Sequence, residues 1–138
     1  MAKSSGLGAT ISIDDSGGTL RDVSTGVLSF NVGTPRGSAD ITGVDKSAVE
    51  KILLLADGTF SLTGQFDPTA TTGLHTVLRT ASSTSVTRTV TIVFNSSPTA
   101  TLSMEMICTS YGIGRGADGN ATCTAEFVLQ SGTAPTWS

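Results

Sequence analysis

The chain has few charged and few aromatic residues for its length. Of its 138 residues, 14 % are charged and 5 % are aromatic, whereas roughly 25 % of an average soluble domain is charged. It has one histidine, His75, and a lone histidine cannot build a zinc-type metal site. Its eight basic residues are scattered and the net charge is −3. This argues against a free-standing nucleic-acid-binding protein, because such a protein needs a basic patch that can displace counterions from phosphates.

Long apolar runs are also missing. No run approaches the roughly 20 residues that a membrane-spanning helix needs, and the N-terminal "MAKSSGLGAT" lacks the charged-then-apolar pattern of a secretory signal. The sequence therefore predicts no membrane association and a cytoplasmic site of synthesis. In that compartment the two cysteines, Cys108 and Cys123, are expected to stay reduced.

Serine and threonine take the place of the missing charges, with 18 Ser and 23 Thr in the chain. Two explanations remain open on composition alone. Either much of the surface is covered by copies of the same chain, or the protein is a Thr-rich β-protein with neutral outer faces.

The dominant sequence period is two, which is typical of half-buried strands. Apolar residues alternate with hydroxyl-bearing residues in six segments: 9–13, 27–32, 59–66, 86–94, 100–108 and 121–129. Residues 51–55 are also expected to be extended, because Asp57-Gly58 is a strong hairpin turn into the next strand. The pattern predicts a sheet with one apolar face and one face lined with hydroxyls.

One helix is expected within residues 67–81. Its N-cap is predicted to be one of three threonines, Thr69, Thr71 or Thr72. Helical spacing is expected to dock three residues on the sheet, namely Leu74, Val77 and Leu78. His75 is expected on the solvent side.

The remaining segments are connections and ends. Residues 33–46 form a long polar connection rich in Gly, Pro and Ser, residues 1–8 a flexible N-terminal arm, and residues 131–138 a C-terminal tail. For Trp137 in that tail two alternatives stay open: it packs back on its own domain, or it is used in an assembly.

Several motifs resemble binding or catalytic motifs, but the residues around them argue against those functions. Residues 114–119 spell G-x-G-x-x-G, but an alternating strand follows instead of the helix that a phosphate site needs. We therefore predict a hairpin tip. Cys108 and Cys123 are about equally far from this tip, which predicts cross-strand neighbours, with reduced thiols favoured over a disulfide. Glu105 and Glu126 are interpreted as part of a solvated face rather than as an acid–base pair. No catalytic set is present, so we predict no enzyme, no cofactor and no metal.

Two segments together resemble the core of the tail tube proteins of long-tailed phages. "LLLADGTFSLTGQFDPTATTGLHTVL" contains a short apolar run, a D-G turn, an alternating strand that ends in G-x-F-D, and a following helix. "LRDVSTGVLSFNV" is similar to the N-terminal strand entry of that family and "ADITGVDKSA" to its variable stacking loop. The long C-terminal hairpin also fits. The resemblance extends from about Leu20 to Ser131, and no immunoglobulin-like domain follows.

The resemblance implies a mainly β fold, an antiparallel β-sandwich or barrel-like tail-tube domain with one α-helix packed on the sheet. Residues 1–138 would form one domain, with 33–46 as an inter-ring loop. Six copies would form a ring, and stacked rings would form a tube through which DNA passes without specific binding. The implied partners are the chain itself and the tape measure, tail terminator and baseplate proteins. The protein would belong to the virion tail and be made in the cytoplasm of the bacterial host.

Two sets of residues are predicted to carry this function. The hydroxyl faces of the last two strands are expected to line the lumen through Thr101, Ser103, Glu105, Thr122, Thr124 and Glu126. The polar connection is expected to contact an adjacent ring through Thr34, Pro35, Arg36, Asp40, Asp45 and Lys46.

Other function classes remain open. A soluble carbohydrate-binding or adhesin-like β-sandwich is the main rival, although the chain has one Trp and one Tyr with which to build aromatic platforms. Another tail component of related fold, such as a tail terminator or a baseplate hub protein, is the nearer rival.

Overall fold

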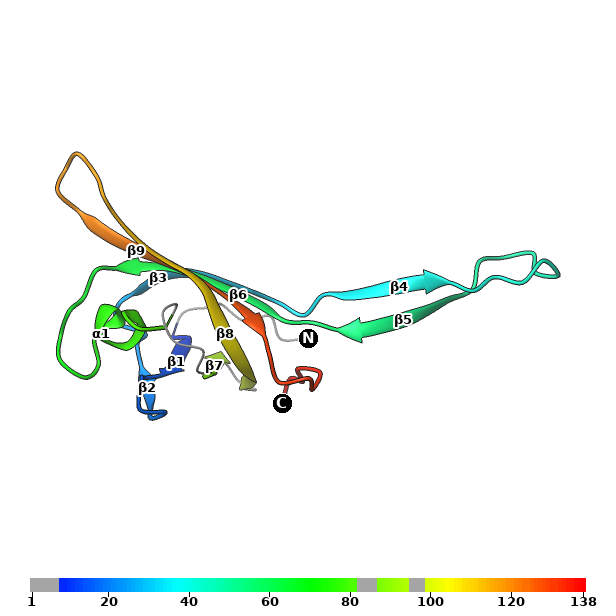
Figure 1. The fold of residues 1–138 in the computed structure, drawn as a ribbon, viewed down its shortest axis with the longest axis horizontal. Helices are drawn as coiled ribbons and strands as arrows, with labels where there is room; N and C mark the ends of the chain where they lie inside the picture. The colour runs from blue at the N-terminus through cyan, green and yellow to red at the C-terminus, as the bar shows by residue number, and fades with distance from the viewer. Residues whose placement is uncertain (1–7, 82–86, 95–98) are drawn as a thin grey trace.

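The computed structural model of the chain describes residues 8–81, 87–94 and 99–138. These residues form nine strands and one short helix (Figure 1). In chain order they are β1 (Thr10–Asp14), β2 (Leu20–Asp22), β3 (Val27–Gly33), β4 (Arg36–Asp40), β5 (Lys51–Ala56), β6 (Thr59–Gln65), α1 (Leu74–Leu78), β7 (Arg88–Phe94), β8 (Ala100–Arg115) and β9 (Ala121–Leu129). The expected N-terminal arm lies outside the described residues except for Gly8, and so does Val86 of the expected strand 86–94.

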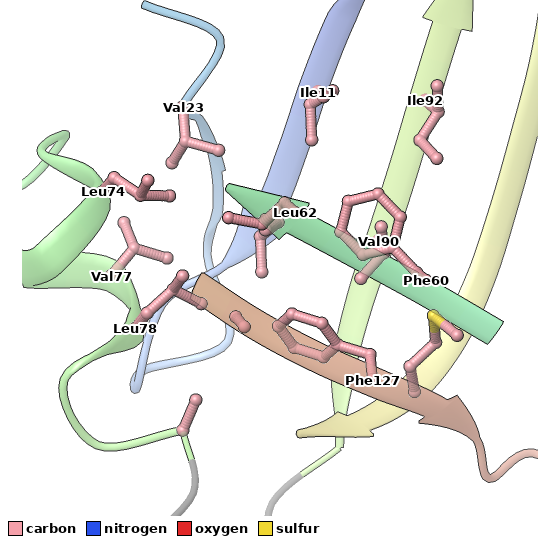
Figure 2. Packing of buried hydrophobic residues seen from close by; sticks show 14 of the residues in the cluster. Ile11, Val23, Phe60, Leu62, Leu74, Val77, Leu78, Val90, Ile92 and Phe127 are labelled. Atoms are coloured by element: carbon pink, nitrogen blue, oxygen red, sulfur yellow. The ribbon is translucent and has the colours of Figure 1, made fainter. Parts of the chain in front are cut away.

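Seven strands form one antiparallel sheet in the order β2-β1-β7-β8-β9-β6-β3. The sheet curls over, so that β6 and β9 cross β1 and β7 with apolar side chains between them (Figure 2). Its two edges, β2 and β3, do not meet, and the barrel is therefore not closed. The predicted class, a mainly β antiparallel and barrel-like fold with one helix on the sheet, is confirmed.

The core lies on the inner side of the curled sheet. Alternate residues of five strands fill it: Ile11 and Ile13 of β1, Phe60 and Leu62 of β6, Val90 and Ile92 of β7, Leu102, Met104 and Met106 of β8, and Cys123, Ala125 and Phe127 of β9. Full burial of one large apolar side chain contributes about 1.5–3 kcal/mol. The period-two pattern in the sequence therefore locates both the strands and their buried face.

Helix α1 is shorter than expected and begins later. Its N-cap is Gly73, which makes no side-chain cap hydrogen bond, so the prediction of a threonine cap is wrong. Thr69 instead forms a local turn with Asp67, whose Oδ1 accepts hydrogen bonds from the Thr69 amide at 3.0 Å and the Thr69 hydroxyl at 2.5 Å. The prediction that the apolar stripe docks on the sheet is confirmed, since Leu74, Val77 and Leu78 are all buried.

The long hairpin of β8 and β9 is confirmed, but its register differs from the one expected. Cys108 lies opposite Phe127, while Cys123 lies opposite Ile113. The main cause is the position of the turn, which lies at residues 116–120, beyond the Arg115–Ala121 pair and further along the chain than equal distances from the two cysteines require. A bulge between Cys108 and Ser110 also shifts the pairing by one residue. The prediction that the two cysteines are cross-strand neighbours is therefore wrong. Both thiols are free.

The segment 33–46 is not an irregular connection throughout. Residues 36–40 form β4, which pairs antiparallel with β5 in a separate two-stranded sheet that projects from the body (Figure 1). The sequence of β4, "RGSAD", contains no β-branched or aromatic residue. Its extended conformation depends on backbone pairing with β5, which the local sequence does not reveal. The prediction that residues 51–55 are extended is confirmed.

The C-terminal tail folds back onto the sheet. Trp137 forms an isolated bridge with Leu102, and Thr101 and Ser138 exchange two N–H···O bonds of 2.9 Å. The Trp137 ring lies 6.3 Å from that of Phe94, although 48 % of the residue stays exposed. Of the two alternatives for Trp137, the structure therefore shows the first, packing on its own domain.

Candidate functional site

The six residues predicted to line a lumen share the outer face of the sheet, away from the core. Ser103, Glu105, Thr124 and Glu126 are exposed, while Thr101 and Thr122 are half-buried. Each alternates along its strand with buried residues such as Leu102 and Ala125. Alternation thus places all six on one face, but whether that face lines a lumen stays a prediction.

This hydroxyl face is wider than the six residues. Thr91 and Ser103 lie opposite each other on β7 and β8, with their hydroxyl oxygens 3.2 Å apart. On the other side of β9, three polar residues of β6 face three members of the set: Ser61 faces Glu126, Thr63 faces Thr124, and Gln65 faces Thr122. The alternating pattern of these neighbouring strands was the signal for extending the set beyond β8 and β9.

The two carboxylates of this face are not a pair. The Thr89 hydroxyl donates a hydrogen bond to Glu105, its cross-strand partner on β7. Glu126 lies opposite Ser61 on one side and Ser110 on the other. The register of β8 against β9 thus places the acidic groups apart along the sheet, since the Gln130 amide, and not Glu126, lies beside Glu105. The geometry offers two isolated negative charges among hydroxyls, which suits a solvated wall and not acid–base chemistry.

The six residues predicted to contact another ring are all exposed and lie in or beside the β4–β5 ribbon, defined here as residues 34–56. Thr34 and Pro35 enter it, Arg36 and Asp40 are the first and last residues of β4, and Asp45 and Lys46 lie in the loop at its end. Arg36 donates from Nε to the carbonyl oxygen of Leu54 at 2.6 Å.

The end of the ribbon is closed by a local hydrogen-bond network. The Thr42 amide donates to Asp40 Oδ1 at 2.9 Å, the Thr42 hydroxyl donates to the same oxygen at 2.5 Å, and the Glu50 amide donates to that hydroxyl at 2.8 Å. These hydrogen bonds from Thr42 hold the pKa of the Asp40 carboxyl below its usual range. Lys46 adds an ion pair of 3.6 Å with Glu50.

The sequence interpretation missed the apolar surface of the ribbon. Of the twelve large hydrophobic residues that are exposed in the described part of the chain, seven belong to the ribbon: Ile41, Val44, Val49, Ile52, Leu53, Leu54 and Leu55. Ile52 and Leu53 lie on opposite faces, because side chains alternate along a strand, so both faces of β5 are apolar. The signal was the run "ILLL", which has no polar residue to face solvent on either side.

His75 was expected on the solvent side, and this is wrong. Its side chain is half-buried between two aromatic rings, 4.6 Å from Phe66 and 5.9 Å from Tyr111 between centroids. His75 Nδ1 lies 2.8 Å from the Tyr111 hydroxyl. Burial and then the neighbouring Cys123 thiol raise the pKa of Tyr111. The helix is shorter than expected, and the residue that follows β6, Phe66, closes over this side of it.

The sequence interpretation did not single out Arg88. Arg88 comes two positions before Val90 and four before Ile92, so it lies on the same, buried side of β7 as they do. It is fully buried. Its Nη1 donates to the carbonyl oxygens of Asp14 at 2.9 Å and Val77 at 3.0 Å. No salt bridge to a carboxylate is recorded for it among the described residues. Because these contacts join β1, α1 and β7, Arg88 fixes the position of the helix and belongs to the fold, not to a surface site.

Two further findings concern other kinds of site. Among residues 8–81, 87–94 and 99–138, no three His, Cys, Asp or Glu side chains are grouped so as to hold a metal ion. Over the same residues no helix has the length and apolar character that crossing a bilayer requires.

By sequence the chain matches no known family and no curated protein, but solved structures do match. A chain from the tail of an empty gene transfer agent particle with C6 symmetry gives a TM-score of 0.77 at 13 % identity, covering 99 % of both chains. A chain of the native gene transfer agent virion gives 0.73 at 12 %, again over 99 % of both. A chain of the six-fold baseplate of the anti-feeding prophage gives 0.66 at 9 %, over 100 % of this chain and 97 % of that one. At these identities the likeness shows the fold, and the predicted tail-tube fold is confirmed.

Proposed function

We propose that this chain is a structural tail protein whose copies form six-membered rings, and that the rings stack into a hollow tube through which DNA leaves the particle. The observation that carries the proposal is the match over 99 % of both chains to a tail with C6 symmetry. In this proposal the protein is made in the cytoplasm of a bacterial host and resides in the virion tail. Its partners are its own copies and the tape measure, terminator and baseplate proteins, and it is not an enzyme.

The β4–β5 ribbon supports self-assembly. Leu53 is 62 % exposed and Leu55 is 92 % exposed, and contiguous exposed apolar surface of this kind marks an interaction site. A ribbon with two apolar faces cannot bury both against its own body. Contacts with other copies, made through the ribbon and its predicted residues such as Arg36 and Lys46, cover it.

The open edges of the sheet support closure into a ring. β2 and β3 each have one strand neighbour in the main sheet, so each leaves a row of backbone donors and acceptors available for pairing. A ring in which the sheet of one copy continues into that of the next removes these edges. This closure turns an open, curled sheet into one segment of a larger barrel.

The outer face of the sheet supports the role of a conduit. It presents hydroxyls with Glu105 and Glu126 as its charged members on β8 and β9, and it offers no cation there to bind phosphate. At physiological salt the repulsion from the carboxylates extends about 8 Å. A wall of this composition keeps DNA from adhering without blocking its passage.

Negative-stain electron microscopy of the purified protein tests the proposal. Tubes or stacked six-fold rings support it, and dispersed monomers contradict it. Replacing Leu53 and Leu55 together by serine is expected to leave a folded monomer that forms no tubes. Replacing the same two leucines by methionine is the matched control, because it changes the same exposed positions but keeps them apolar; this variant is expected to assemble as the wild type does.

A second experiment tests the lumen. The double charge reversal Glu105→Lys with Glu126→Lys is expected to leave tubes intact and to hinder DNA release from particles that carry it. If the monomer folds but tubes fail to form, these residues belong to an interface and the lumen assignment is wrong.

The likeness to a baseplate chain at a TM-score of 0.66 favours one further candidate, a terminator or hub component. Rings that form but do not stack would support that role. Dispersed monomers that bind a glycan would instead support the carbohydrate-binding alternative.

A further inference from the structure

The molecule has two projections that point in opposite directions along its longest axis. The β4–β5 ribbon leaves the body on one side and the tip of the β8–β9 hairpin leaves it on the other (Figure 1). The pairing agrees with this view. The ribbon continues β3 and β6 from the Gly33–Thr59 pair, whereas the hairpin tip lies beyond Gly64 and its partner Cys123, at the other end of β6.

A small apolar surface lies beneath the hairpin at that end. We call it the ledge and define it by Phe66, His75, Tyr111 and Ile113. Phe66 is 37 % exposed and Ile113 is 51 % exposed, while His75 packs against Phe66 and Tyr111 from behind. Because side chains alternate along a strand, Ile113 lies on the same face of β8 as Tyr111, and its partner on β9 is buried Cys123. The ledge therefore prolongs the core side of the sheet past the point where the core ends.

We propose that the ledge of one copy receives the β4–β5 ribbon of the next copy in the stack. The inference rests on the proposed function, since it takes the copies to be stacked in one direction. Two stacked copies are taken to have the same orientation and to differ by a shift along the long axis. The hairpin end of one copy then faces the ribbon of its neighbour. Two different apolar surfaces at opposite ends make a heterologous contact, and between copies related by a shift along one axis such a contact repeats without closing on itself.

Charge complementarity favours one face of the ribbon. Lys51 and Leu53 share a face, because side chains alternate along a strand, and Leu55, which is 92 % exposed, follows where the pairing with β4 shifts. At the ledge, Asp67 follows Phe66 directly, and the hydrogen bonds that it accepts from Thr69 reach one of its two oxygens. The lysine and the two exposed leucines of β5 thus match a ledge with two exposed apolar side chains and the carboxylate of Asp67 next to it.

The opposite face of β5 fits the ledge less well. Ile52 and Leu54 are each about half exposed, at 47 % and 46 %, and Leu54 lies against Gly37 of the partner strand. This face already has part of its apolar surface covered within the ribbon. It is left for a different contact in the assembly.

A charge-swap cycle tests the proposal. Leu55→Lys and Ile113→Glu each place a charge in the proposed contact and are expected to raise the critical concentration for tube formation at least about tenfold. The double variant places lysine against glutamate at every contact and is expected to assemble within about threefold of the wild type. Leu55→Met and Ile113→Met are the controls, because they change the same two positions without adding a charge; both are expected to assemble as the wild type does. Circular dichroism establishes that each monomer is folded.

The outcomes separate the two proposals. If the wild type forms no tubes under any condition, the proposed function fails. If the wild type forms tubes but Ile113→Glu forms them equally well, or if the double variant assembles no better than the worse single variant, the function stands and the ledge does not receive the ribbon.

Discussion

Gly64 is the position at which a single methyl group tests the packing of the fold most directly. It lies in β6 on the core side, opposite Cys123. A Cβ atom added there would lie well inside 3.0 Å of the carbonyl oxygen of Gly26 and of a methyl carbon of Leu74. The first of these atoms is backbone and cannot move aside without displacing the turn before β3. Gly64 is therefore the place where α1 and this turn approach the sheet.

The loss of stability expected for Gly64→Ala follows from that geometry. Overpacking a core by one methyl group costs about 1–3 kcal/mol, and the fixed backbone atom puts Gly64→Ala at the upper end, about 3 kcal/mol. At about 2–4 °C per kcal/mol, Tm is expected to fall by about 6–12 °C. Thermal unfolding followed by circular dichroism, below the concentration at which assembly begins, measures this shift.

Gly114 is the matched control in the same protein. It also lies in a strand, and a Cβ there would meet nothing within 4 Å. Gly114→Ala is expected to leave stability unchanged or to raise it by about 0.5 kcal/mol, because alanine reduces the entropy of the unfolded chain. Equal Tm values for the two alanine variants would refute the claim that close packing at Gly64 positions α1.

Three further predictions concern titration and reactivity. The chain has one tyrosine, and burial raises the pKa of Tyr111 above its usual 10. Tyrosinate absorbance at 295 nm should therefore appear at a higher pH in the folded protein than in the unfolded protein, and stability should fall as pH rises above 10. Equal titration curves for the two states would contradict the burial of this hydroxyl. Burial also raises the pKa of both thiols, so iodoacetamide should react slowly with them at pH 7. Half-buried Cys108 should be modified before buried Cys123, as followed by peptide mass mapping. The opposite order would contradict the register of β8. Thr42→Val removes the hydroxyl that lowers the Asp40 pKa; the carboxyl titration followed by NMR should move up towards 3.8, and an unchanged midpoint would show that Thr42 is not the cause.

Much of the fold could be read from the sequence because alternation has a direct physical cause. Leu102, Met104 and Met106 alternate with Ser103 and Glu105, and a strand that is buried on one face requires this pattern. The strand positions, the buried face and the hydroxyl face all follow from it. The docking residues of α1 follow in the same way from helical spacing.

The parts that could not be predicted depend on partners distant in the sequence. β4 has no strand pattern of its own, and its strand character comes from pairing with β5. The register of β8 against β9, with its turn beyond the Arg115–Ala121 pair, is set where the two strands meet, and it places both cysteines away from their expected partners. Arg88 looked like an ordinary polar residue, since the carbonyl groups that hold it come from β1 and α1.

The sequence by itself determined that this protein is a sheet with an apolar side and a hydroxyl side, because burial on one face selects residues with a period of two. Only the tertiary structure decided where the remaining apolar residues lie: on both faces of a projecting ribbon at one end and on the ledge beneath the hairpin at the other. The reason is that exposure is a property of the packed molecule. From the sequence the run "ILLL" looks like part of the core, but the packing of the described residues leaves all four of its side chains between 46 % and 92 % exposed.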